Sequence, residues 1–105
     1  MKGFPQVSDD NFPEIIREHE VVLMIFSSQD CGYCQLAKRN LREIIDQLSK
    51  LQVYECLISE VPEIREKYKI TSVPVFKLFK EGKVVYTGFG VRESNDLYYQ
   101  LSSFL

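Results

Sequence analysis

The feature that most constrains this chain is an abrupt change of pattern after residue 26. Val21 to Phe26 form a short, continuous apolar run rich in β-branched residues, which is typical of a strand covered on both faces in a parallel sheet. From Cys34 to about Lys50, apolar residues recur on one side of a helical wheel, whereas Lys38 faces elsewhere. A buried strand followed directly by a long amphipathic helix predicts an α/β fold.

Three further helices are expected. The first follows the possible caps Ser8 to Asn11 and has Pro13 early in its sequence. Pro62 opens a short helix, because proline is tolerated in a first helical turn. Ser94 can cap the last helix, whose apolar residues form a stripe that would pack against the core.

Three further strands complete the pattern. Val53 to Ile58 has strand character, as do Val75 to Phe79 and Val84 to Thr87. The four residues between the last two favour a hairpin that turns at Gly82. A hairpin added to parallel strands predicts a mixed sheet.

Composition limits the classes of protein that fit. A chain of 105 residues, 45% of them hydrophobic, suits a single domain spanning residues 1–105 with a core of its own. The net charge is only -2 and no stretch is dense in Lys and Arg, so we expect no nucleic-acid partner. No signal peptide or membrane segment is visible. Three cysteines, an odd number, suit a reducing compartment, so we expect a cytoplasmic protein. We also expect a monomer.

The motif that carries chemistry is Cys31-Gly32-Tyr33-Cys34, which lies between the buried strand and the long helix. The amino terminus of a helix favours a thiolate, so Cys31 is the expected nucleophile. Cys34, three positions later, is near enough to resolve a mixed disulfide on Cys31. The alternatives are inert packing or half of a zinc site, which would need two more ligands. Only Cys56 and His19 remain, without ligand spacing, so redox chemistry is favoured and no metal is expected.

Further motifs resemble the thioredoxin family and run in order through nearly the whole chain. They are the segment Ser8-Asp9-Asp10-Asn11-Phe12, the segment Thr71-Ser72-Val73-Pro74, the turn Glu81-Gly82-Lys83, and Gly90. The Gly-Tyr centre is also similar to that of glutaredoxins, but those lack the extra amino-terminal strand and helix that residues 1–20 predict. The resemblance implies a thioredoxin fold, with a central mixed sheet of about five strands flanked by about four helices.

The resemblance also implies a substrate surface around the cysteines. It implies that the Val73–Pro74 bond is cis, that Pro74 packs beside the cysteines, and that the Val73 backbone pairs with an extended substrate. Gly90, in the loop Gly88-Phe89-Gly90, would form another wall where a substrate backbone approaches closely, although an ordinary strand-exit turn is the alternative. The remaining predicted substrate contacts are Asp30, Gly32 and Tyr33.

The chain departs from the usual family sequence Trp-Cys-Gly-Pro-Cys. Asp30 stands in place of the tryptophan, Tyr33 stands in place of the proline, and there is no Trp anywhere in the chain. An aspartate beside Cys31 should disfavour its thiolate and removes a flat apolar contact for substrates. Alternatively, Asp30 caps the helix, and both roles are compatible.

The buried acid of the family is also missing. It commonly lies six residues before the first cysteine, where this chain has Ile25. Glu55 falls where the family often has a lysine near that acid, and we hypothesise that Glu55 transfers the proton of Cys34. The alternative is a strand glutamate that points to solvent. Cys56 is interpreted as a small buried hydrophobe without a catalytic role.

These patterns predict a thiol–disulfide oxidoreductase that reduces or exchanges protein disulfides. It would need no bound cofactor beyond its own redox-active Cys31–Cys34 disulfide. Its partners would be disulfide-containing proteins and a recycling system, either a thioredoxin reductase or, for a glutaredoxin-like reductase, glutathione. The competing hypothesis is a thioredoxin-fold binding module with little turnover, and retention of both cysteines argues against it.

Overall fold

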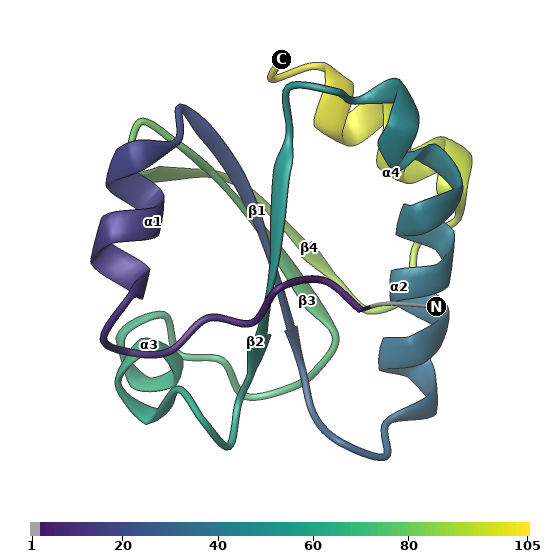
Figure 1. Ribbon diagram of the computed structural model, residues 1–105. Helices are drawn as coiled ribbons and strands as arrows, with labels where there is room; N and C mark the ends of the chain where they lie inside the picture. Colours follow the sequence, from purple (N-terminus) through teal and green to yellow (C-terminus); the bar gives the residue numbers. More distant parts are fainter. Residues whose placement is uncertain (1–2) are drawn as a thin grey trace.

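A four-stranded sheet lies between two layers of helices in the computed structural model, which describes residues 3–105. Figure 1 shows α1 and α3 on one face of the sheet and α2 and α4 on the other. The strand order is β2-β1-β3-β4. In chain order the elements are α1 (Phe12–Glu18), β1 (Val21–Ser27), α2 (Gly32–Ile44), the 3-10 helix η1 (Ile45–Gln47), β2 (Gln52–Leu57), α3 (Pro62–Lys67), β3 (Val75–Lys80), β4 (Lys83–Phe89) and α4 (Ser94–Ser102).

β1 is one of the two inner strands, and all seven of its residues are buried. It runs parallel to β2 and antiparallel to β3, which confirms the mixed sheet. Its side chains alternate between two cores. Leu23 and Ile25 pack on the side of α2 and α4, whereas Val22 and Met24 pack on the side of α1 and α3.

The long helix is shorter than its apolar spacing predicts. α2 ends at Ile44 and continues as the single 3-10 turn η1, rather than reaching Lys50. The N–H of Leu48 donates to Ile45 O at 3.0 Å, and the N–H of Leu51 donates to Leu48 O at 2.9 Å. Both leucines are buried in the core on the side of α2 and α4.

The predicted hairpin between β3 and β4 is confirmed. Lys80 pairs with Lys83, so the loop consists of Glu81 and Gly82. Both loop residues have positive φ, 51° and 81° respectively. This is the backbone that a two-residue hairpin with a primed turn requires, and it explains the glycine at the second position.

The fifth strand expected near the amino terminus is reduced to one isolated bridge, between Gln6 and Glu55. The N–H of Val7 donates to Glu55 O at 2.9 Å, and the N–H of Glu55 donates to Pro5 O at 2.8 Å. Pairing does not extend further, because Pro5 has no N–H and a turn begins at Asp9. Within residues 3–105 the sheet therefore has four strands rather than about five.

The helix caps differ from those expected. Ser94 belongs to the first turn of α4, and its hydroxyl donates to Asn40 O at 2.9 Å, which fastens α4 to α2. α3 is capped from a distant segment, because the Asp9 carboxylate accepts the N–H groups of Glu63 and Ile64 at 3.1 and 3.0 Å. Because Asp9 lies far from α3 in the sequence, no local sequence pattern predicts this cap.

Candidate active site

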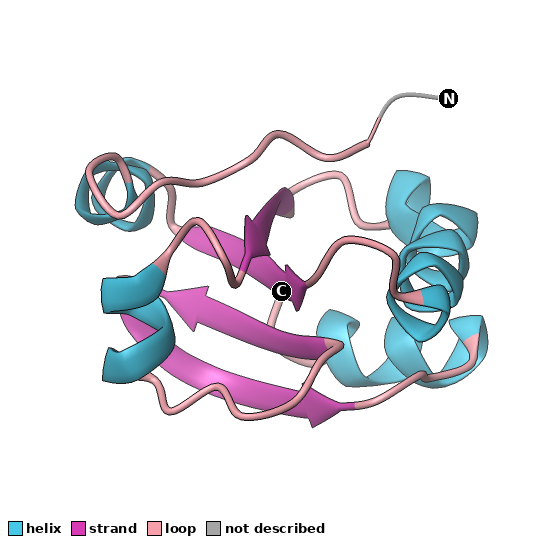
Figure 2. Cartoon of the chain, turned by 90° about the horizontal axis from the view of Figure 1, so that it is seen from below, coloured by secondary structure: helices cyan, strands magenta, loops and turns pink. Residues whose placement is uncertain are grey.

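Three chain segments meet at one edge of the sheet, which Figure 2 views from below. β1 ends there, and its Phe26 pairs with Val75, the first residue of β3. Val75 in turn pairs with Phe89, the last residue of β4. The register therefore brings the loop before α2, the segment before β3 and the loop after β4 to the same edge.

Cys31 and Cys34 form a disulfide at the amino terminus of α2, with their Cα atoms 5.2 Å apart. Cys31 is the N-cap residue, and its Sγ accepts the N–H of Cys34 at 3.1 Å. Cys34 is completely buried, whereas Cys31 is partly exposed. A partner sulfur in solution can therefore approach Cys31 but not Cys34.

Asp30 does not cap α2. The N-cap is Cys31, and Asp30 precedes it as an exposed residue with φ 57°. Aspartate tolerates this left-handed backbone better than most residues do. Gly32 and Tyr33 follow in the first turn, and the Tyr33 side chain is 73% exposed.

The Val73–Pro74 bond is cis, as the family resemblance implies. Pro74 is buried and Val73 is half-buried. The N–H of Gly90 donates to Pro74 O at 2.9 Å, so the loop after β4 is fastened to the cis-proline segment. Gly90 has φ 76°, a conformation that favours glycine.

Gly88 serves the packing of the sheet. A Cβ at this position would lie 2.5 Å from Tyr86 Oη, so the glycine makes room for the tyrosine hydroxyl. Within residues 3–105, this hydroxyl is the one buried side-chain N or O atom without a hydrogen-bond partner. Burial raises the pKa of Tyr86, with a smaller upward effect from Asp96 against a downward one from Arg92.

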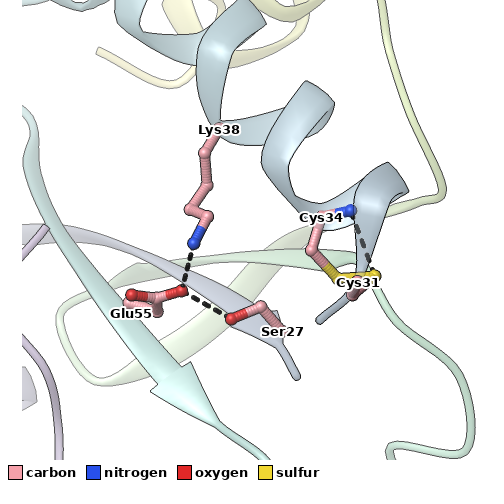
Figure 3. A network of polar contacts seen from close by, with 5 residues as sticks. All are labelled: Ser27, Cys31, Cys34, Lys38 and Glu55. Carbon is pink, nitrogen blue, oxygen red and sulfur yellow. Dashed lines mark hydrogen bonds and ion pairs between the residues drawn. A yellow bond between two sulfur atoms is a disulfide. The ribbon is translucent and has the colours of Figure 1, made fainter. Parts of the chain in front are cut away.

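A buried polar network lies beside the cysteine pair (Figure 3). Glu55 Oε2 accepts the Ser27 hydroxyl at 2.6 Å and Lys38 Nζ at 2.7 Å. The side chains of Lys38 and Glu55 are only 9% and 6% exposed. In residues 3–105 these three are all of the buried polar or charged residues. The alternative that Glu55 points to solvent is therefore wrong. The prediction that Lys38 faces away from the core is wrong as well.

Glu55 lies next to the position expected for a buried acid. It pairs in register with Ile25 on the neighbouring parallel strand, so the two side chains point to the same face of the sheet. That face is the one covered by α2. Sequence reasoning missed Ser27 and Lys38, although strand alternation places Ser27 on this face and Lys38 lies one helical turn after Cys34.

Cys56 is separated from this network by the sheet itself. It follows Glu55 on β2 and therefore points to the opposite face, where its Sγ lies 3.8 Å from Met24 Sδ. Burial, then the negative charges of Glu55 and Asp9, raise its pKa to about 12. A thiol that stays protonated is a poor nucleophile, which agrees with its interpretation as a buried hydrophobe.

Residues 3–105 contain neither a cluster of metal-binding side chains nor a helix suited to cross a membrane. Over residues 3–105, His, Cys, Asp and Glu nowhere gather in threes in a way that could hold a metal ion. His19 instead has its Nε2 3.3 Å from Tyr54 Oη, far from the cysteine edge. In the same part of the chain, no helix has the length and apolar character needed to cross a membrane.

Comparison with known proteins gives consistent results for sequence and fold. The family model described as Thioredoxin matches residues 3–103. Thioredoxin 1 of Plasmodium falciparum is 33% identical over 87 residues, which cover 83% of this chain and 84% of that protein. Thioredoxin of Rickettsia bellii is 36% identical over 93 residues, covering 87% and 89%. A solved Plasmodium falciparum thioredoxin superposes with a TM-score of 0.86 at 29% identity, covering 96% of this chain and 99% of that one.

Proposed function

Since this chain belongs to the thioredoxin family and is a thiol–disulfide oxidoreductase, we propose that it reduces disulfides of other proteins through Cys31 and Cys34. The observation that carries the proposal is the unequal exposure of the two sulfurs at the start of α2. Cys31 is partly exposed and Cys34 is completely buried. A substrate can therefore form a mixed disulfide with Cys31, and Cys34 is held behind it for the second step.

The reaction transfers two electrons from the dithiol to the substrate disulfide. The Cys31 thiolate attacks one substrate sulfur, forms a mixed disulfide and releases the other substrate sulfur as a thiolate. Cys34 then loses its proton and attacks Cys31 Sγ, which forms the Cys31–Cys34 disulfide, breaks the bond between Cys31 and the substrate, and releases the second substrate sulfur as a thiolate. The Cys34 N–H that donates to Cys31 Sγ, together with the positive end of α2, stabilises the attacking thiolate.

Glu55 is the proposed proton acceptor for Cys34. It is the buried carboxylate on the face of the sheet that α2 covers, and the Ser27 hydroxyl donates to it. A general base acts within hydrogen-bond reach or through one water molecule. We propose the second route, with Ser27 orienting the carboxylate beside the cysteine pair.

The substrate would lie across the edge where the three segments meet. The Val73 backbone would pair with an extended stretch of substrate, and Gly90 would let the substrate backbone approach closely. The other proposed contacts are Asp30, Gly32 and Tyr33. The exposed Tyr33 ring offers the flat apolar contact that a tryptophan would otherwise supply.

Members of this family act on disulfide-containing proteins and are recycled by reductases. For this chain we propose recycling by a thioredoxin reductase rather than by glutathione, since the sequence and fold both match thioredoxins. We propose a monomeric single domain that binds no cofactor beyond its own disulfide. A reducing compartment such as the cytoplasm fits a chain with an unpaired third cysteine.

A redox titration against dithiothreitol tests this proposal, with alkylation and mass spectrometry reporting each cysteine separately. We expect Cys31 and Cys34 to oxidise together as one two-electron couple while Cys56 stays reduced. A midpoint near about -270 mV supports a reductant, whereas one near about -120 mV would make the protein an oxidant. Failure of the two thiols to pair would favour the binding-module hypothesis.

The Cys34→Ser variant tests the order of attack. It should accumulate a mixed disulfide between Cys31 and a disulfide-containing protein such as insulin, because the resolving thiol is missing. Cys31→Ser is the matched control and should trap nothing. Trapping by Cys31→Ser instead of Cys34→Ser would reverse the proposed roles. Recycling by NADPH with thioredoxin reductase, compared with glutathione and glutathione reductase, identifies the electron donor.

A further inference from the structure

Lys38 is a buried lysine on the helix that carries the resolving cysteine. Its side chain is 9% exposed, and its Nζ lies 2.7 Å from Glu55 Oε2. Cys34 and Lys38 are four residues apart, so their side chains lie one turn apart on the same face of α2. Lysine is almost never this buried without a partner, so the pairing with Glu55 accounts for its position.

The two carboxylate oxygen atoms of Glu55 differ in their contacts. Ser27 Oγ and Lys38 Nζ both donate to Oε2 (Figure 3). Oε2 is also the oxygen on the side of the cysteine pair in this view (Figure 3). A buried carboxylate without a cation is disfavoured relative to the neutral acid, and a neutral acid cannot serve as a base. The Lys38 ammonium is the cation that pairs with this buried carboxylate.

We propose that Lys38 is a positioning residue for the resolving step, because its ammonium keeps the Glu55 carboxylate ionised and oriented to take the Cys34 proton. The inference rests on the proposed role of Glu55. Lys38 itself exchanges no proton and contacts no substrate. The proton passes from Cys34 Sγ to Glu55, and the Cys34 thiolate attacks Cys31 Sγ. The bond between Cys31 Sγ and the substrate sulfur then breaks, and the substrate sulfur leaves as a thiolate.

The other charged and titratable groups around Glu55 do not replace Lys38. Among residues 3–105, Lys38 is the one cation paired with Glu55. Ser27 on β1 donates a neutral hydroxyl, and Cys56 on β2 lies on the opposite face. Asp9, in the segment before α1, is held by the backbone of α3. Within this part of the chain, Lys38 is therefore the side chain whose loss would leave the Glu55 carboxylate without a paired cation.

The test measures the resolving step alone. Reduced protein is mixed with a small chromophoric disulfide, Ellman's reagent, in a stopped-flow instrument. Release of the second chromophore reports the attack of Cys34 on Cys31, and its rate is followed on both sides of neutral pH. The variants are Lys38→Met, Lys38→Arg, Glu55→Gln and Lys38→Met/Glu55→Gln. Lys80→Met is the matched control, because Lys80 lies at the other end of the sheet and bonds to Phe104 O.

We expect Lys38→Met to slow the resolving step about tenfold at neutral pH and to move the acid limb of its pH profile to higher pH. Lys38→Arg should restore the profile, because the positive charge is retained. In the Glu55→Gln background, Lys38→Met should have no further effect, since it acts through the carboxylate. Lys80→Met should behave as the unchanged protein does.

The outcomes separate this inference from the proposed function. If Glu55→Gln leaves the rate and its pH profile unchanged, the proton-transfer role of Glu55 is wrong and the inference fails with it. If Glu55→Gln alters the profile and Lys38→Met does not, only the role of Lys38 is wrong. Should Lys38→Met fail to fold, the double variant decides, because it leaves no unpaired buried charge. A rate equal to that of Glu55→Gln supports the inference, and a further loss overturns it.

Discussion

Glu55 and Cys56 are neighbours in sequence on β2, yet they belong to two different environments. Glu55 faces α2 and accepts two hydrogen bonds beside the redox-active disulfide. Cys56 faces α1 and α3, in a core of apolar side chains where it lies near Met24. The pleat of one strand therefore separates a polar site from a passive core. The environments of these two residues are therefore set by the face of the sheet to which each side chain points, and not by their closeness in sequence.

The two cores differ in what holds them together. On the α1 and α3 side, the rings of Phe12, Tyr68 and Phe79 pack edge to face, with centroids 5.6–5.9 Å apart. On the α2 side, the buried polar residues Ser27, Lys38 and Glu55 interrupt the apolar packing. Buried ion pairs contribute little net stability, so this network is explained better by chemistry than by folding.

The largest expected effect distinguishes Cys31, at the start of α2, from Cys56, which faces α1 and α3. Cys31→Ser should lower the rate of insulin disulfide reduction to that of dithiothreitol alone, because the nucleophile that forms the mixed disulfide is lost. Cys56→Ser should retain the rate of the unchanged protein. The measurement is the turbidity assay for insulin reduction by dithiothreitol. Strong inactivation by Cys56→Ser in a folded protein would contradict the division between the two faces.

The second prediction compares stability on the two faces. Phe79→Ala should lower the free energy of unfolding by about 3–5 kcal/mol, because it removes a fully buried ring from the aromatic cluster. Replacing the ion pair by Lys38→Met/Glu55→Leu should leave stability unchanged or raise it by up to about 4 kcal/mol, since two desolvated charges are removed.

Urea unfolding measures both stability effects, and the insulin assay supplies the functional contrast. The ion-pair variant should be folded but slow, whereas the Phe79→Ala protein that remains folded should be as active as the original. A large loss of stability in the ion-pair variant would show that the network is structural.

The sequence predicted most of the fold and the centre of the site for identifiable reasons. Cys31 and Cys34 follow a strongly buried strand, and the hairpin at Gly82 has a local turn signal. Lys38 was missed because a lysine beside an apolar helical stripe usually reaches solvent, and only its distant partner Glu55 keeps it buried. The weak pairing of Gln6 with Glu55 also depends on residues far apart in sequence.

The smallest expected effect is the part of the pH dependence of stability that arises from Cys56, on the α1 and α3 side of the sheet. Burial raises the pKa of Cys56 from 9.0 to about 12, so the folded protein keeps this thiol neutral where the unfolded chain ionises it. The resulting stability is fully present below pH 9.0 and is lost as pH rises toward about 12.

Urea unfolding at alkaline pH tests this effect against Cys56→Ala, which lacks the titrating thiol. The free energy of unfolding should fall more steeply in the original protein, by at most about 1.4 kcal/mol per pH unit. Both proteins should carry the Cys31–Cys34 disulfide, so that Cys56 is the only cysteine that titrates. If the free energy of unfolding falls with pH equally in both proteins, solvent reaches Cys56 on the α1 and α3 side. Glu55 and Cys56 would then differ in their hydrogen-bond partners and not in their burial.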